Sequence, residues 1–426
     1  MRLLYSALYY CLLPLLLLRM LWRSRLAPGY RRRLPERFGL FPARPDAGTP
    51  AIWVHAVSVG ETLAAAPLVD ALLRDYPAYR VVLTTTTPTG SEQVRALFGD
   101  RVFHVYAPWD LPGPLRRFLC RTRPRLLLIM ETELWPNMLH YCARSGCRVL
   151  LLNARLSARS ARGYARLPWL VAPMLQQLDT VACQTSADGE RFLALGLSPT
   201  ALAVTGSVKF DLAIAPPMRV QAAGLRQVFA VGDRPVLVAA STHAGEEALL
   251  LAAYRDIRRD LGACLLVLVP RHPERFAEVF ALCSQQGWQV RRRSEGRDPG
   301  AADDILLGDT MGELRLLLGT ATVAVFGGSL LAQGGHNVLE AAAWGVPAIT
   351  GPHMENFAGV CELMSTAGAL IQLQEPARLG ACLSQLLADP GRCRRMGAAG
   401  ERVMAENRGA GARQLSLVAR QLAFAP

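Results

Sequence analysis

The sequence has almost no lysine. Of its 47 basic residues only Lys209 is a lysine, and the rest are arginines. A preference for arginine throughout a chain reflects codon usage, whereas a single lysine is consistent with a position that requires a compact ammonium group. Chance survival of one lysine is the alternative. Lys209 is therefore a candidate functional residue.

The sequence also lacks the cysteine and histidine spacings of metal sites. Its ten cysteines include no CxxC pair and no Cys/His cluster at zinc spacing, a pattern that predicts free thiols in a reducing compartment and no metal. The net charge of +13 calls for an acidic partner, which can be nucleic acid, phospholipid or a phosphorylated substrate. No basic stripe interleaved with aromatic residues is present, so we expect no nucleic-acid partner.

The first 40 residues contain an apolar run followed by positive charge. Leu3 to Leu18 carries no charge, and seven arginines lie between Arg19 and Arg37. A signal peptide has the opposite charge order, and the positive-inside rule places the rest of the chain in the cytoplasm. We expect a membrane anchor at 1–40, either a short span with its N-terminus outside or a helix in the membrane interface. Each arginine near anionic lipids contributes about 1 kcal/mol.

Short apolar strands alternate with helices after the proline-rich linker Phe41–Pro50, a pattern typical of parallel, doubly wound α/β sheets. The predicted strands are Ala51–Val57, Arg80–Thr85, Arg101–Tyr106, Leu126–Met130, Val149–Leu152, Pro235–Ala240, Cys264–Val269, Ile305–Leu307, Ala321–Phe326 and Val346–Thr350. An Ala/Pro-rich stretch before Met218 suggests two Rossmann-like domains, 41–215 and 216–426. A final helix at Gln414–Phe424 is expected to be able to pack back on the first domain.

Ligands of such sheets bind at the carboxyl ends of the strands. Glu61 follows the first strand, beside Ser58 and Gly60, at a predicted helix start. A helix N-terminus favours a charged carboxylate, which predicts a lowered pKa and a general base; a capping role alone is the alternative. The threonines around Thr86 follow the second strand and are suited to bind sugar or phosphate, or to serve as strand residues and an N-cap.

Two further carboxylates, Glu131 and Glu133, follow the fourth strand. Alternation along an extended chain would point both side chains to the same side. Arg155 follows the fifth strand. Polar groups at several strand ends of one sheet make a binding site more plausible than any one of them does.

The second domain repeats this arrangement. Polar residues and glycines that follow its strands are Ser241, His243, Arg271, Met311, Gly312, Glu313, Gly328, Ser329, Asn337 and Glu340. The stretch Val325–Thr350 reads as strand, glycine-rich loop, helix from His336 or Asn337, and strand. Glycines allow close approach of a phosphate to backbone N–H groups, while tight packing of the loop is the alternative. We expect a nucleotide site here, as in two-domain glycosyltransferases of GT-B architecture.

Several motifs then resemble one family, the 3-deoxy-D-manno-octulosonate (Kdo) transferases of lipopolysaccharide assembly. These motifs are His55–Thr62, Met130–Asn137, Asn153–Ser157, Thr205–Asp211, Val269–His272 and Val325–Thr350. The resemblance covers nearly the whole chain, including the N-terminal anchor.

The resemblance implies inverting, metal-independent transfer of Kdo from CMP-Kdo to lipid IVA at the cytoplasmic side of a bacterial inner membrane, with no cofactor. Glu61 matches the family's general base, and Glu131 and Glu133 match a second acidic position. Arg271, Met311, Gly312, Glu313, Ser329, Asn337 and Glu340 match the family's CMP site, and Lys209 lies in a family-like motif. From their positions after strands or in the glycine-rich loop, Ser241, His243 and Gly328 are further donor candidates with Lys209, and Ser58, Gly60, Thr86 and Arg155 are acceptor candidates.

Two alternatives remain open from the sequence. One is another two-domain enzyme that uses a UDP-sugar, a glycosyltransferase or an epimerase. The other is a non-catalytic membrane protein that binds lipid on the same scaffold.

Overall fold

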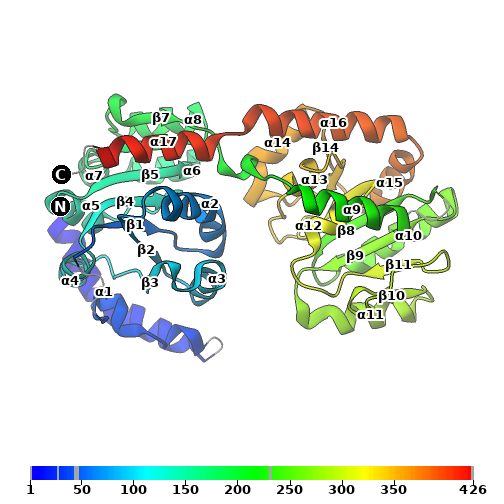
Figure 1. The fold of residues 1–426 in the computed structure, drawn as a ribbon, viewed down its shortest axis with the longest axis horizontal. Coiled ribbons are helices and arrows are strands. Elements are labelled where there is room, and N and C mark those ends of the chain that lie inside the picture. The colour runs from blue at the N-terminus through cyan, green and yellow to red at the C-terminus, as the bar shows by residue number, and fades with distance from the viewer. Residues whose placement is uncertain (1, 26–27, 43–47, 230–232, 424–426) are drawn as a thin grey trace. The chain divides into compact units, whose positions relative to one another are not determined.

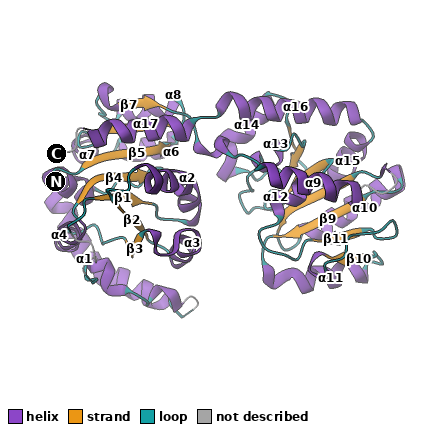
Figure 2. Cartoon of the chain, viewed as in Figure 1, coloured by secondary structure: helices purple, strands orange, loops and turns teal. Residues whose placement is uncertain are grey.

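The computed structural model describes residues 2–25, 28–42, 48–229 and 233–423 and divides the chain into two compact units. The first comprises Met1–Asp211 with Arg408–Pro426, and the second comprises Leu212–Asn407. The sequence prediction placed this division between residues 215 and 216. Strands alternate with helices in both units (Figures 1 and 2).

The first unit is built on a seven-stranded parallel sheet of order β3-β2-β1-β4-β5-β6-β7. Its strands are β1 (Ala51–His55), β2 (Arg80–Thr85), β3 (Phe103–Tyr106), β4 (Pro124–Met130), β5 (Arg148–Ala154), β6 (Thr180–Cys183) and β7 (Leu202–Val204). The apolar run of β4 is buried because helices cover both faces of a parallel sheet. The sequence prediction missed β6 and β7, which are short.

The helices of the first unit are α1 (Arg2–Arg23), α2 (Val59–Asp75), α3 (Pro88–Phe98), α4 (Pro112–Thr122), α5 (Pro136–Arg144), α6 (Ala158–Tyr164), α7 (Pro168–Leu175), α8 (Ser186–Ala194) and α17 (Ala410–Ala423). Most of them lie between consecutive strands, whereas α1 precedes β1 and α17 follows the second unit in the sequence. Ser58 caps α2 and Thr87 caps α3 through their hydroxyl groups, and proline occupies the first turn of α4, α5 and α7.

The last helix packs on the first unit, as Figure 1 shows in red. Val418 and Leu422 of α17 join the apolar cluster beneath α2. The Asp211 carboxylate accepts the backbone N–H groups of Gly409 and Gly411, each at 2.6 Å, and so fixes the start of α17.

The second unit contains another seven-stranded parallel sheet, of order β10-β11-β9-β8-β12-β13-β14. Its strands are β8 (Val236–Thr242), β9 (Leu265–Pro270), β10 (Val290–Arg292), β11 (Ile305–Leu307), β12 (Val323–Phe326), β13 (Ala348–Thr350) and β14 (Leu370–Gln372). Its helices are α9 (Pro216–Phe229), α10 (Glu246–Leu261), α11 (Phe276–Gln285), α12 (Leu314–Leu318), α13 (Leu339–Ala342), α14 (Ala358–Thr366), α15 (Leu379–Leu387) and α16 (Pro390–Asn407).

Each sheet reverses its strand order at one point, where chain connections leave in opposite directions. In the first unit this point lies between β1 and β4, and in the second between β8 and β12. A crevice outside the carboxyl ends of the strands forms at such a position. The residues that follow these four strands therefore lie at the two crevices.

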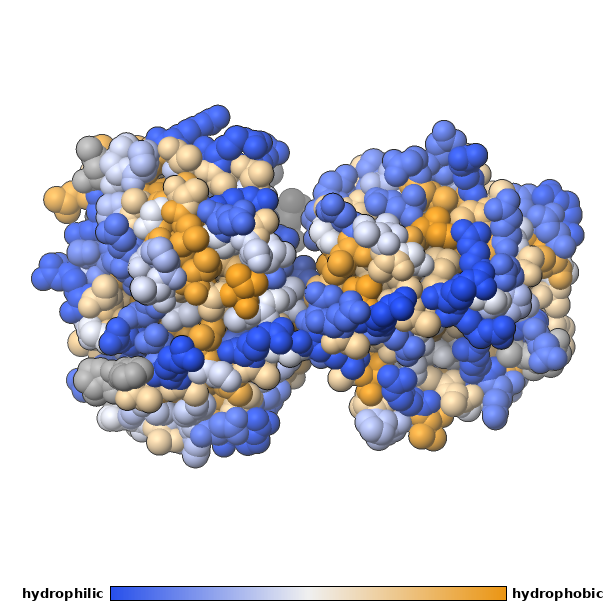
Figure 3. All heavy atoms as spheres, turned by 90° about the horizontal axis from the view of Figure 1, so that it is seen from above, coloured by the Kyte–Doolittle hydropathy of each residue, from blue (hydrophilic) through white to orange (hydrophobic). Residues whose placement is uncertain are grey.

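Helix α1 is the one helix, among the described residues, that is long and apolar enough to cross a membrane. Its outward residues Leu3, Leu15, Leu18 and Trp22 are 62–73% exposed. On the face that Figure 3 shows, hydrophilic side chains cover most of each unit, with apolar patches between them.

Candidate functional site

Glu61 lies in the first turn of α2, directly after β1. Its carboxylate accepts a hydrogen bond from the Val57 backbone N–H at 2.9 Å and one from the Ser58 hydroxyl at 3.0 Å. The Ser58 hydroxyl in turn accepts the Glu61 N–H at 3.3 Å. Ser58 thus caps α2, and Glu61 reaches back to the N–H of the residue before the cap, in a variant of the capping box. The capping role that the sequence left open is present.

The prediction of a lowered pKa for Glu61 is wrong. Burial raises the pKa of Glu61 to about 7, and the charges of Glu133 and Glu131 add to the increase. The hydrogen bonds from Val57 and Ser58 lower the pKa but do not outweigh burial. The side chain is 8% exposed, so loss of hydration outweighs the helix N-terminus. A carboxyl with a pKa near 7 is well matched to take a proton from a hydroxyl at neutral pH.

Glu131 and Glu133 lie at the end of β4, on the other side of the reversal point. The extended geometry assumed from the sequence is wrong, because Glu131 has φ 57° in the left-handed region. Its carboxylate lies 3.3 Å from Arg155 Nε, whereas that of Glu133 accepts the Trp135 indole N–H at 3.0 Å. Burial raises the pKa of Glu133, and the charge of Glu131 adds to this.

Lys209 belongs to this same cluster in the first unit. Burial lowers the pKa of Lys209, and the positive charge of Arg155 lowers it further. The negative charge of Glu131 raises this pKa and so opposes both effects. The Lys209 segment is fixed by Asn153, whose side-chain oxygen accepts the Val208 N–H at 3.3 Å. Lys209 thus lies with the predicted acceptor residues, and its assignment to the donor stays a prediction.

The remaining acceptor candidates lie at the ends of β1 and β2. Thr86 donates through its hydroxyl to Val57 O at 3.0 Å, and Gly60 is in the first turn of α2. His55, the first residue of the family-like motif, is fully buried, and burial lowers its pKa to about 3. Its ring bonds to the Thr84 hydroxyl at 2.9 Å, so His55 belongs to the core.

In the second unit a buried carboxylate occupies the reversal point between β8 and β12. Glu246 accepts backbone N–H groups from His243 at 2.9 Å, Gly328 at 2.7 Å, Leu330 at 3.0 Å and Leu331 at 3.3 Å. Of these N–H groups, only that of Gly328 belongs to a glycine that the sequence analysis named for phosphate. The loop therefore folds around an internal anion, a role that the sequence reading missed.

Close packing of the strand ends also accounts for two residues of this loop, Gly327 and Ser329. A Cβ at Gly327 would lie 2.4 Å from Ser241 O, so the ends of β12 and β8 can approach only if this residue is glycine. Ser329 donates to Phe326 O and accepts the Gly351 N–H at 2.8 Å. Its hydroxyl joins two strand ends, and so the packing alternative holds for both residues.

The predicted helix start at His336 or Asn337 is also wrong. Helix α13 begins at Leu339, because Asn337 turns its side-chain oxygen to the Leu339 N–H at 3.3 Å and so ends the loop before the helix. Glu340 lies in the first turn of α13, 3.6 Å from Arg315. Burial raises its pKa, and Arg315 and Arg271 oppose this.

His243 and His336 form a close pair beside Arg271. Their Nε2 atoms are 2.9 Å apart and their rings stack at 5.2 Å. Burial lowers the pKa of His336 to about 4, and His243 and Arg271 add to this. His243 also packs edge-on against His272. The rings are thus neutral and rich in hydrogen-bonding positions, and His336 was missed from the sequence.

The Met311–Glu313 turn carries an exposed methionine before α12. Met311 is 64% exposed and Gly312 has φ 85° with open space around it. Burial opposes ionisation of Glu313, but hydrogen bonds from Arg293 and Thr310 outweigh it and hold the pKa of Glu313 below its usual value. The Arg293 contact, at 3.1 Å, could not be read from local sequence.

No group of three or more His, Cys, Asp or Glu residues within the described ranges could hold a metal ion. The two units thus each present polar clusters at the ends of their central strands. In the first unit these are carboxylates with Lys209 and Arg155, and in the second they are arginines, histidines and the carboxylates of Glu313 and Glu340.

Comparison with known proteins identifies the family of the chain. Residues 32–212 match the family model described as 3-deoxy-D-manno-octulosonic-acid transferase (kdotransferase). The chain is 40% identical to the 3-deoxy-D-manno-octulosonic acid transferase of Haemophilus influenzae over 98% of both chains. It is 41% identical to that of Bordetella pertussis over 95% of both.

The fold is that of the GT-B glycosyltransferases. A solved glycosyltransferase from Rickettsia africae superposes with a TM-score of 0.57 at 10% identity, over 88% of this chain and 99% of the other. The alternative of a non-catalytic scaffold is thereby set aside, because near-full-length identity of 40% extends through both units. The chain belongs to the 3-deoxy-D-manno-octulosonic acid transferases and is a glycosyltransferase.

Proposed function

We propose that the enzyme transfers Kdo from CMP-Kdo to the phosphorylated glycolipid lipid IVA, with inversion at the sugar and without a metal. The observation that carries this proposal is the position of Glu61, at the strand reversal of the first sheet with a pKa of about 7. Family membership supplies the transferred sugar.

In the proposed reaction a Glu61 carboxylate oxygen takes the proton of the acceptor hydroxyl. The hydroxyl oxygen forms the new bond to the anomeric carbon of Kdo as the bond from that carbon to the CMP phosphate breaks. The phosphate leaves with the bonding electron pair. The nearby charges of Glu131 and Glu133 make a negative charge on Glu61 less favourable. They raise the pKa of Glu61 and so make it a stronger base.

The second unit is proposed to hold CMP through Arg271 and the histidine pair His243–His336. Arg271 is exposed at the end of β9 and supplies a permanent positive charge to the phosphate. In the hydrogen bond between the two rings one imidazole donates its N–H and the other accepts, so only the accepting ring keeps an N–H, on its Nδ1, for a phosphate oxygen. The proposed role of the glycine-rich loop is to position these residues through Glu246, with its N–H groups bonded internally.

We also propose that α1 lies in the inner-membrane interface on the cytoplasmic side. Its first turns are held on the first unit, because Arg2 and Ser6 both bond to Asn137 and the Tyr9 ring packs on Trp109. Directly after its last residue, Ser24 accepts the Arg31 Nε–H from the turn that follows. The outward face of α1 is leucine-rich. A helix held along a domain and apolar on its free side suits the interface better than a span.

Mass spectrometry of lipid IVA incubated with CMP-Kdo and the enzyme tests the reaction, and the mass gain counts the Kdo residues added. We expect a Kdo adduct with the wild type and none with Glu61→Gln. Binding of CMP, followed by thermal stabilisation, should remain in Glu61→Gln. Near-normal turnover by this variant would remove Glu61 as the base, and stabilisation by UDP but not CMP would overturn the donor.

A further inference from the structure

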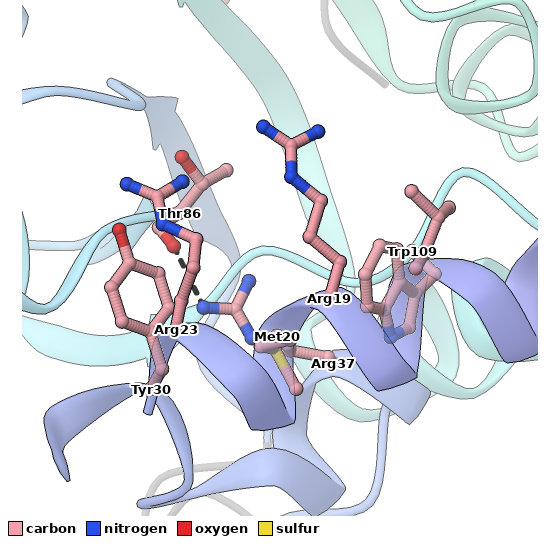
Figure 4. Close-up of a pocket in the computed structure, with 8 residues that line it drawn as sticks. Arg19, Met20, Arg23, Tyr30, Arg37, Thr86 and Trp109 are labelled. Atoms are coloured by element: carbon pink, nitrogen blue, oxygen red, sulfur yellow. Dashed lines mark hydrogen bonds between the residues drawn. The ribbon is translucent and has the colours of Figure 1, made fainter. Parts of the chain in front are cut away.

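A cavity of about 150 Å³ lies between the second half of α1 and the body of the first unit (Figure 4). Its lining residues are Leu16, Arg19, Met20, Arg23, Tyr30, Arg37, Thr86 and Trp109. The four residues from α1 are spaced by three, one and three positions, so they share one face of the helix. The cavity has about ten times the 10–15 Å³ that one water needs.

The lining is cationic. Three of the eight lining residues are arginines, and none is acidic. In the view of Figure 4 the side chains of Arg19 and Arg23 rise from α1, with the Arg37 guanidinium between them. The nearest carboxylate in sequence, Glu36, is already bonded to Arg33 Nε at 2.6 Å and to the Tyr106 N–H at 2.8 Å.

Two buried donors of this lining have no acceptor. Arg37 is 6% exposed and donates one N–H to Thr86 O at 2.7 Å, but its Nε has no partner. The indole nitrogen of Trp109 is also buried and without a partner. Both groups are donors only. Buried donors are normally satisfied, so these two nitrogens show that this region is rich in donors and poor in acceptors. Both nitrogens are shielded from solvent, and a ligand in the cavity would bond to the other N–H groups of the arginines that line it.

The charge on Arg37 calls for an anionic partner. Burial lowers the pKa of its guanidinium, and none of the carboxylates in the described part of the chain is hydrogen-bonded to it. The ring of Tyr106 lies 4.4 Å from its Cζ, and Arg23 lies 5.0 Å from the Tyr30 ring. Aromatic faces stabilise these cations only partly. An anion bound between the arginines would compensate for the lost hydration.

The cavity lies beside the apolar face of α1 and close to the proposed base. Leu15, Leu18 and Trp22, next to the lining residues along α1, point outward. On the other side Thr86 bonds to Val57 O, and the Val57 N–H is the donor to Glu61. A ligand here would have its charged end in the cavity and its hydrocarbon along α1.

We infer that this cavity binds the phosphate of a lipid headgroup. The inference rests on the proposed interfacial position of α1. The phosphate can belong to an anionic membrane phospholipid or to the phosphorylated acceptor lipid, since both carry the same group at the same depth.

Vesicle binding by the full-length protein tests the inference. The variant Arg19→Gln/Arg23→Gln is compared with Arg25→Gln/Arg32→Gln, which removes the same charge from exposed positions of the same segment outside the cavity lining. We expect at least a tenfold loss of affinity for phosphatidylglycerol-containing vesicles in the cavity variant and less than threefold in the control. Equal losses in the two variants mean a diffuse basic surface and overturn the inference.

A second arm separates the two lipid sources. KM for the bisphosphorylated acceptor is measured in neutral detergent without phospholipid. A tenfold higher KM in the cavity variant alone assigns the site to the acceptor, and an unchanged KM with weaker vesicle binding assigns it to phospholipid. If both measurements match the control, no phosphate site exists. The vesicle arm needs no turnover, so the inference can be judged even if Kdo transfer to lipid IVA is not observed.

Discussion

The Glu246 carboxylate accepts the backbone N–H of Gly328 at 2.7 Å, across 82 residues of sequence. The same carboxylate holds Leu330 and Leu331 on one side and His243 on the other. The loop after β12 and the loop after β8 are therefore fixed to one buried anion. The position of the histidine pair depends on this contact.

Glu246→Ala should cost about 3–5 kcal/mol of unfolding free energy, because it removes a buried charged acceptor and leaves four donors unpaired. Urea unfolding measures this. Glu362→Ala, which removes an exposed carboxylate of the same unit, should change the free energy of unfolding by less than about 0.5 kcal/mol. Equal values for the two variants would show that the loop does not need Glu246.

Glu61 should make both activity and stability depend on pH. Because its pKa is raised from 4.5 to about 7, the base form grows as pH rises, so kcat/KM should increase up to about pH 7 and then level off. The pH–rate profile at low substrate concentration measures this. A profile flat from pH 5 to 8 would contradict the assignment.

The stability effect of Glu61 has the opposite sign. A carboxyl with a raised folded-state pKa stabilises the fold below about pH 4.5, and that contribution, about 3 kcal/mol, is lost as pH rises through 7. Glu61→Gln, neutral at every pH, should therefore raise Tm by several degrees at pH 8 and leave it nearly unchanged at pH 4.5. Equal shifts at both pH values would mean that burial of the charge is not the cause.

Lys209→Arg should reduce kcat/KM at least tenfold. The side chain lies partly buried between Glu131 and Arg155, where a wider guanidinium cannot replace an ammonium without moving its neighbours. Steady-state kinetics give the answer, with Arg226→Lys, on the exposed side of α9, as the matched exchange. If both exchanges leave activity unchanged, the single lysine is an accident of codon usage.

Leu15→Glu/Leu18→Glu should detach the enzyme from membranes. Both side chains are 62% exposed on α1, and burial of each leucine in lipid is worth about 1.5–3 kcal/mol. The partition coefficient between vesicles and solution, measured by sedimentation, should fall at least a hundredfold. Val220→Glu, at an exposed apolar position of α9, should leave membrane binding unchanged. An equal loss of binding in this variant would mean that the added negative charge causes the detachment.

Deletion of residues 1–22 is a less specific test of the same anchor. It removes the exposed leucines but also the partners of Asn137 and the Tyr9 ring that packs on Trp109. We expect release from membranes with the catalytic core retained and a lower unfolding temperature. Full retention on membranes would shift the binding to the remaining arginine-rich surface.

The sequence by itself determined the two parallel sheets, the apolar first helix, the family and most of the strand ends that carry polar groups. Apolar runs, N-caps and glycine spacing are local, so strands such as Arg80–Thr85 are readable without coordinates. The motif containing Glu61 was likewise visible.

The tertiary structure decided how these groups behave. The pKa of Glu61 rises because residues distant in sequence bury it, which reverses the prediction from the helix terminus alone. The Glu246 carboxylate, 82 residues away in sequence, accepts the Gly328 N–H of the glycine loop, and a phosphate role for this loop stays a prediction. The cavity of Arg19, Arg37 and Trp109 joins α1 to strand ends. Desolvation and long-range hydrogen bonding depend on which segments meet, and no local pattern encodes that meeting.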